Sequence, residues 1–178
     1  MKKTISVLVM IMCLTGVVKA QIYGSDVYYY VPAGENITQS TTVEIVYFDG
    51  RVAWFGSDRC SNILNQLNSN SSYFLNKAKK DLRNPDEDFR VPNRYRYDSS
   101  ISTSTKKVYK WVDTYWTGVA FGGRNTSGYC YYAVSNDKET LISWYENTSN
   151  EVRNKKYYTR VDVKDLAPKP ANRDFLYD

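Results

Sequence analysis

Carboxylates that neighbour tryptophan are the residues of this chain whose types could support catalysis. Asp113 lies between Trp111 and Trp116, and Glu146 follows Trp144 after one intervening residue. A glycoside hydrolase uses two carboxyl groups, about 5 Å or about 6.5–9.5 Å apart, and one of them sits in an apolar setting. Both acids also fit solvent-facing positions on strands, which is the simpler interpretation. A small secreted hydrolase of the glycosidase type is therefore an alternative and not the leading hypothesis.

Histidine is absent from the sequence. Its absence excludes Ser-His-Asp and Cys-His catalysis and every metal site that needs a histidine ligand. Ser104 and Ser135 each begin a Ser-x-x-Lys match, but they fall before a predicted strand and in a predicted turn instead of at the head of a buried helix. We therefore predict no catalytic residue, no metal site and no cofactor. An enzymatic function stays open, but we favour a non-catalytic one.

Aromatic side chains are the most abundant groups suited to binding, with 17 tyrosines and four tryptophans in the chain. They offer a large contact area and a polar tip at low entropic cost, which suits ligand recognition. The residues that we expect to bind a ligand are Arg94, Tyr95, Arg96, Tyr97, Trp111, Tyr115 and Trp116. Two simpler interpretations stay open: arginines that lie over packed tyrosines at a sheet edge, and tyrosine used for its high β propensity.

Short strands dominate the predicted secondary structure. The segments with strand character are 27–31, 42–48, 51–55, 106–116, 119–121, 128–135, 140–146 and 156–163. Asp49-Gly50 separates two of them and is a strong hairpin signal, because both turn residues need a positive φ. Hairpin-length spacings imply antiparallel pairing. Residues 84–104 lack a clear period, so we expect an irregular connection there.

Apolar residues at helical spacing predict a helical segment over residues 58–83. Ser57 or Asp58 can cap its start, and Asn84-Pro85 ends it. The polar run 68–72 is a poor helix interior, because serine and asparagine side chains compete for backbone hydrogen bonds. The segment is therefore either one long helix or two short ones.

Together these elements predict a single α+β domain over residues 21–178. Its core is mainly an antiparallel sheet, strongly twisted or partly closed, with the helical segment of about 58–83 packed on a face. A C-terminal tail from about residue 167 is expected to be extended.

The first twenty residues have the pattern of an export signal. Lys2 and Lys3 precede a nearly continuous apolar run over residues 5–18, and the small residues Val18 and Ala20 indicate cleavage after Ala20. The run is shorter than the roughly 20 residues of a membrane-spanning helix, so we predict no transmembrane segment. The short, lysine-rich start is typical of bacteria, and we expect a periplasmic or secreted protein.

Removal of the signal changes what the composition implies. It takes away three lysines and no acidic residue, so the formal charge falls from +5 to +2. A charge that small predicts no nucleic-acid partner. Cys60 and Cys130 are the two cysteines that remain, and in an oxidising compartment we predict a disulfide between them. Two separate buried thiols are the alternative.

The leading hypothesis is therefore a non-catalytic exported bacterial module that binds an extracellular or periplasmic protein or glycan through surface aromatics. The alternatives are the small carboxylate-based hydrolase and an inhibitor of a secreted enzyme. The inhibitor would present a rigid exposed loop, such as residues 122–128. The sequence gives no indication of the oligomeric state.

Overall fold

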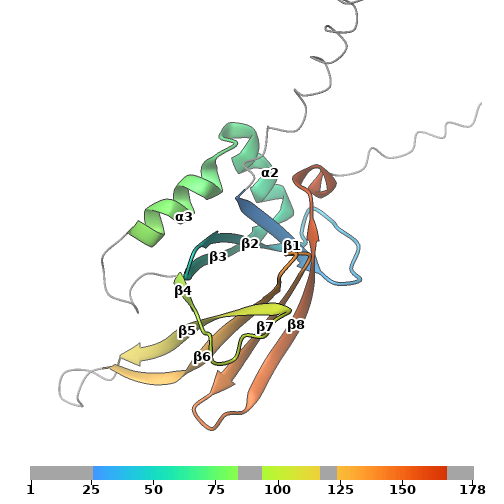
Figure 1. Cartoon of the computed structure of the whole chain (residues 1–178). Coiled ribbons are helices and arrows are strands. Elements are labelled where there is room, and N and C mark those ends of the chain that lie inside the picture. Colours follow the sequence, from blue (N-terminus) through green and yellow to red (C-terminus); the bar gives the residue numbers. More distant parts are fainter. Residues whose placement is uncertain (1–25, 84–93, 117–123, 168–178) are drawn as a thin grey trace, which may run out of the picture.

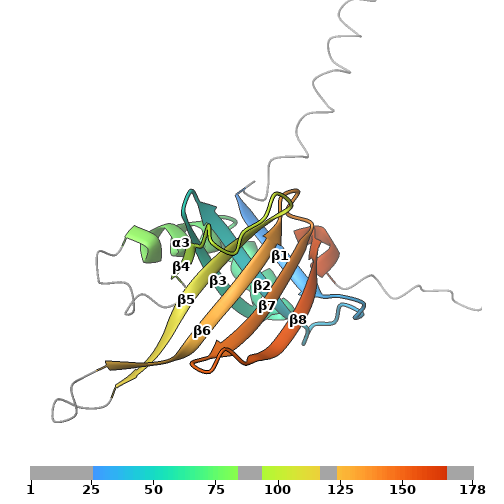
Figure 2. The same cartoon turned by 60° about the horizontal axis from the view of Figure 1, so that its bottom comes forward.

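The strands of this protein form a closed antiparallel barrel in which each strand pairs with its neighbours in sequence and the last pairs with the first (Figure 1, Figure 2). The computed structural model describes residues 26–83, 94–116 and 124–167, with the side chains of 112–116 and 124–126 excepted. The strands within these residues are β1 (Val27–Pro32), β2 (Thr42–Asp49), β3 (Val52–Arg59), β4 (Arg94–Tyr97), β5 (Lys106–Trp116), β6 (Arg124–Ser135), β7 (Thr140–Asn147) and β8 (Val152–Val161). Pairing of β1 with β8, in which Tyr30 lies opposite Arg160, closes the barrel.

The predicted fold class was wrong. The protein is not an α+β sheet with a helix packed on a face but a fully closed barrel, and the described residues are mostly sheet with two short α-helices outside it. The burial of β1 shows why: Tyr29 and Val31 pack outward, while Tyr30 packs into the barrel interior. An open sheet would leave two unpaired edge strands, and closure removes them. The predicted antiparallel pairing is confirmed.

Seven of the eight predicted strands overlap a strand of the structure, although β3 continues to Arg59, β6 begins at Arg124 and β8 spans Val152–Val161. The hairpin at Asp49-Gly50 forms as predicted, with Gly50 at a φ of +59°. The sequence interpretation missed β4, which lies in the stretch 84–104 that was expected to be irregular. β4 has four residues, and each of its two outward-facing positions holds an arginine, so it lacks the apolar character that marks the other strands. The predicted strand 119–121 lies outside the described residues.

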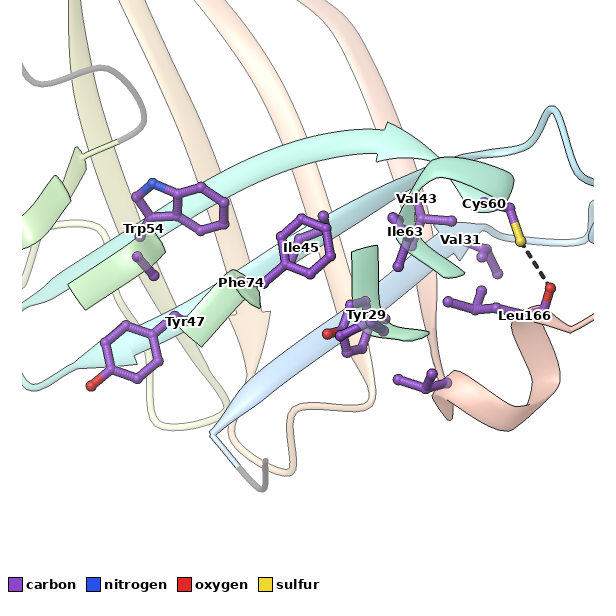
Figure 3. Close-up of a cluster of buried hydrophobic side chains, with 13 residues drawn as sticks. Tyr29, Val31, Val43, Ile45, Tyr47, Trp54, Cys60, Ile63, Phe74 and Leu166 are labelled. Atoms are coloured by element: carbon purple, nitrogen blue, oxygen red, sulfur yellow. Dashed lines mark hydrogen bonds between the residues drawn. The ribbon is translucent and has the colours of Figure 1, made fainter. Parts of the chain in front are cut away.

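Two helices, α2 (Cys60–Ser69) and α3 (Tyr73–Arg83), occupy the predicted helical segment, with a break at Asn70 to Ser72. They cover the outer face of β1 to β3 on one side of the barrel (Figure 1). A buried cluster joins the helices to these strands (Figure 3) and includes Ile45, Ile63 and Phe74. No helix among the described residues has the length and apolar character needed to cross a membrane.

Trp54 fixes α3 to the barrel. Its indole Nε1 donates a hydrogen bond of 2.8 Å to the Asp81 carboxylate of α3, and Lys77 pairs with the same carboxylate at 3.3 Å. The ring lies over Gly56, two residues along β3 on the same face. A Cβ at that position would come within 2.9 Å of Trp54 Cζ2. Glycine is therefore required at residue 56 to make room for the ring.

The predicted disulfide between Cys60 and Cys130 is not formed. Cys60, the first residue of α2, is fully buried, and its Sγ donates to the backbone carbonyl of Leu166 at 2.9 Å (Figure 3). Leu166 belongs to a short 3-10 helix, η2 (Val163–Leu166). Cys130 packs against the barrel interior instead. The barrel wall separates the two sulfurs, so the structure supports the alternative of two separate thiols.

Candidate functional site

Aromatic side chains fill the interior of the barrel. The interior cluster consists of Tyr30, Val46, Ala53, Phe55, Tyr95, Tyr109, Val134, Leu141 and Tyr158. Tyr132 packs against this cluster, and its ring stacks on Phe55 with centroids 4.0 Å apart. Much of the tyrosine excess in the sequence is thus used inside the barrel. An eight-stranded barrel is just wide enough to be filled by side chains or to hold one small ligand.

One end of the barrel is covered by the turn between β6 and β7. Lys138 of this turn donates from Nζ to the hydroxyl of Tyr28 at 2.8 Å, and its Nζ lies 4.6 Å from the centre of the same ring. The hydroxyl of Tyr30 donates to the backbone carbonyl of Lys138 at 2.9 Å. Arg160 and Glu139 form an ion pair of 3.0 Å beside it. Because these contacts hold the turn over this end of the barrel, a ligand would have to reach the interior from the opposite end.

A cavity of about 210 Å³ lies at that opposite end of the barrel, where Glu44 and Ser143 line it together with Cys130 and several tyrosines. An adjoining hollow of about 450 Å³ extends to the β1–β2 loop. The two share Glu44, Lys156 and Tyr158, so they form one space at the mouth of the barrel. Aromatic walls with a few convergent polar groups are characteristic of small-molecule sites.

Glu44 is the central polar group of this site. Its Oε2 accepts a hydrogen bond from the hydroxyl of Tyr132 at 3.1 Å, and its Oε1 accepts one from the hydroxyl of Tyr158 at 3.3 Å. Burial raises the pKa of the Glu44 carboxyl, while the two hydroxyls and the charge of Lys156 act in the opposite direction. A carboxyl with a perturbed pKa in a cavity is a frequent mark of a functional site.

The neighbours of Glu44 form a short polar network inside an otherwise apolar barrel. Burial raises the pKa of the Tyr158 phenol, and the negative charge of Glu44 adds to this effect, while Ser143 acts in the opposite direction. Burial likewise raises the pKa of Tyr132, and the negative charge of Glu44 adds to this effect. Lys156 is exposed at the rim, and among the described residues no cation lies within ion-pair distance of the Glu44 carboxylate.

Trp111 contributes a second feature that needs a partner. It packs against the interior cluster beside Tyr95, with ring centroids 6.2 Å apart. Its indole Nε1 is buried and has no hydrogen-bond acceptor among the described residues. Buried indole N–H groups usually find a partner, so this donor favours an acceptor supplied from outside the described protein atoms.

The barrel wall divides the residues that the sequence predicted for ligand binding. Tyr95, Tyr97 and Trp111 pack with the interior cluster. Arg94 and Arg96 alternate with these tyrosines along β4, and Arg96 lies opposite Lys110 on the outer face. The remaining predicted residues, Tyr115 and Trp116, pair with Asn125 and Arg124 at the far end of β5, and their side chains are outside the description.

The sequence interpretation missed Glu44, Tyr132, Ser143, Lys156 and Tyr158. A signal for Glu44 was present in β2, where every residue from Val43 to Phe48 is apolar except this glutamate. A single acid within a strand that is apolar on both faces lies in a barrel or a core, and it then needs partners. The others could not be assigned without knowing that the sheet closes.

A second group of aromatic side chains lies on the outer face of β5 to β7. Lys110 Nζ lies 3.8 Å from the ring centre of Tyr129 and 5.4 Å from that of Tyr131. Tyr131 stacks on Trp144 with centroids 5.0 Å apart and an interplanar angle of 11°. We call Lys110, Tyr129, Tyr131 and Trp144 the outer aromatic row. Glu146 lies opposite Tyr129 in the next strand, and the side chain of Asp113 is not described.

Comparisons with known proteins add no family to this picture. No family model matches the chain, and no curated protein or solved structure matches it.

Proposed function

We propose that this protein is a non-catalytic binding protein that holds a small molecule at the Glu44 end of its barrel. The observation that carries the proposal is the cavity of about 210 Å³ in which Glu44 meets the hydroxyls of Tyr132 and Tyr158 among aromatic walls. The opposite end is covered by the Lys138 turn, so a ligand enters and leaves at the Glu44 end. Polar groups at fixed positions on rigid strands suit selective binding.

The geometry gives less support to a hydrolase. Such an enzyme needs two facing carboxyl groups. Glu44 lies in the wall of the cavity, whereas Glu35, the other described carboxyl that lines the space, is exposed in the β1–β2 loop. The loop that would serve an enzyme inhibitor falls partly on residues outside the description, and no observation here favours that function.

Two positions on opposite sides of the barrel wall allow a sharp test. Ser143 lines the cavity, whereas Tyr129 belongs to the outer aromatic row and is not among the residues that line the cavity. A library of small molecules should contain compounds that raise the melting temperature of the wild-type protein. Ser143→Leu should abolish that effect by filling the cavity, while Tyr129→Ala should preserve it. Equal stabilisation of the wild type and the Ser143→Leu protein would contradict the proposal, provided that circular dichroism shows both to be folded.

A second candidate function is recognition of a protein or glycan by surface aromatics. The outer aromatic row favours it, because Lys110 lies against aromatic rings on a face that the helices do not cover (Figure 1). Arg96 lies beside Lys110 in register and extends the positive charge. Binding to an immobilised acidic polysaccharide, lost in Tyr129→Ala but kept in Ser143→Leu, would support this function over the first.

We also propose that the protein is exported and that cleavage after Ala20 produces the mature chain. The support is the lysine-rich, apolar pattern of residues 1–20, which lie outside the described structure. N-terminal sequencing of the protein from its natural host would test this, with Gln21 as the expected first residue.

A further inference from the structure

The Glu44 carboxylate accepts hydrogen bonds from two hydroxyls, but among the residues that the structure describes no counter-ion contacts it. We propose that the ligand is a small organic ammonium compound whose protonated amine pairs with Glu44, an inference that rests on the proposed binding function. The polar groups, the aromatic walls and the charge distribution of the cavity each bear on this inference.

The carboxylate keeps acceptor capacity for a ligand. Tyr132 donates to Oε2 and Tyr158 donates to Oε1, one hydroxyl to each oxygen. An ionised carboxylate has about four acceptor sites, so each oxygen retains one that these tyrosines do not use. An ammonium group carries up to three donors and can fill both remaining sites.

The walls around this carboxylate suit a cation. Tyr95, Tyr132 and Tyr158 all line the cavity, and Tyr95 and Tyr132 pack edge to face with centroids 5.0 Å apart. Aromatic faces attract an organic cation through the ring quadrupole, and the attraction grows when the cation is removed from water.

Charge distribution disfavours an anionic ligand at the same place. An anion would lie against the Glu44 carboxylate within a site of low dielectric constant, where like charges repel strongly. Lys156 also lines the cavity, but it is exposed at the rim, so water screens its charge. The inner cavity, at about 210 Å³, is smaller than a typical drug-sized site of about 300–1,000 Å³, so the ligand is small.

The test compares two probes of nearly equal size, 2-phenylethylamine and its neutral counterpart 2-phenylethanol, by calorimetric titration at pH 7. The wild-type protein should bind the amine about tenfold to hundredfold more tightly than the alcohol, because a hydrogen bond to a charged group is worth about 1.5–3 kcal/mol. Glu44→Gln should remove this preference. Glu139→Gln, which deletes one negative charge at the covered opposite end of the barrel, should keep it.

The outcomes separate the ligand class from the proposed function. Equal affinity for amine and alcohol in the wild type would overturn the ammonium inference, as would amine affinity that Glu44→Gln leaves unchanged or no amine binding at millimolar concentration. The wild-type comparison needs no variant, so it remains decisive even if Glu44→Gln fails to fold. Binding of the alcohol that Ser143→Leu abolishes would leave the proposed cavity function intact while the ammonium inference falls.

Discussion

The hydrogen bond between Tyr132 and Glu44 gives the site a measurable stability signature. Tyr132→Phe removes the hydroxyl that donates to Glu44 Oε2 at 3.1 Å and keeps the ring that stacks on Phe55. A hydrogen bond to a charged acceptor contributes about 1.5–3 kcal/mol, and this one is longer than the best O–H to carboxylate bonds of about 2.5–2.7 Å. We therefore expect Tyr132→Phe to lower the free energy of unfolding by about 2 kcal/mol at pH 7.

A double-mutant cycle isolates the charged part of that bond. In a Glu44→Gln background the acceptor is neutral, and the same tyrosine substitution should cost about 1 kcal/mol, the usual value for a neutral hydrogen bond. The coupling energy between the two positions is then about 1 kcal/mol. Urea denaturation measures each free energy of unfolding, and Tyr109→Phe is the control, because Tyr109 is an interior tyrosine opposite Tyr132 on β5.

Two results would refute this reasoning. One is a cost below about 0.5 kcal/mol for Tyr132→Phe, which is the lower limit for a hydrogen bond in a folded protein. The other is an equal cost in the wild-type and Glu44→Gln backgrounds, which would mean that the hydroxyl does not contact a charged carboxylate. Either result would remove the ordered Glu44 site on which the binding proposal depends.

Three further predictions follow from other parts of the structure. Gly56→Ala should lower the free energy of unfolding by about 2 kcal/mol, because the added methyl group meets the Trp54 ring. Adding Trp54→Phe to this variant should recover part of that loss. A Gly56→Ala protein as stable as the wild type would contradict the packing of Trp54 over Gly56. Burial raises the pKa of the Glu44 carboxyl in the folded state, so the folded protein binds a proton at Glu44 more tightly than the unfolded chain does. The free energy of unfolding of the wild type, relative to that of Glu44→Gln, should therefore rise as the pH falls from neutral through this pKa. A difference between the two proteins that is constant with pH would contradict this prediction. Thiol titration of the unreduced, unfolded mature chain should find two reactive thiols, those of Cys60 and Cys130. In the folded protein Cys60 should react more slowly, because it is fully buried. A titration that finds no reactive thiol would mean that the two cysteines form a disulfide.

Local sequence patterns predicted most of the elements but not how they close. The Asp49-Gly50 turn and the break near Asn70 are set by residues close to one another in sequence, and both were visible there. Closure depends on β1 meeting β8, whose residues are more than a hundred positions apart. It also depends on β4, which has only four residues and two outward arginines. Neither the pairing of β1 with β8 nor the strand β4 leaves a local pattern in the sequence.

The sequence predicted that aromatic side chains would form a binding site, but it did not predict which residues face the interior of the barrel. The tyrosine excess indicated an aromatic binding site, but alternation along a strand cannot say which face is the interior when both faces are apolar. Tyr95 and Trp111 therefore lie with the interior cluster, while Arg96 lies on the outer face. Glu44 was passed over, because its burial follows from the closure of the barrel and not from its neighbours in β2.

The most direct test of the central claim is an NMR titration of the isotope-labelled protein with 2-phenylethylamine. The informative signal is the side-chain carboxyl carbon of Glu44, and the indole N–H of Trp54, which bonds to Asp81 outside the barrel, is the internal reference. The cavity proposal predicts that the Glu44 signal shifts with ligand while that of Trp54 stays in place. No shift at Glu44 at saturating ligand, or an equal shift at Trp54, would contradict it.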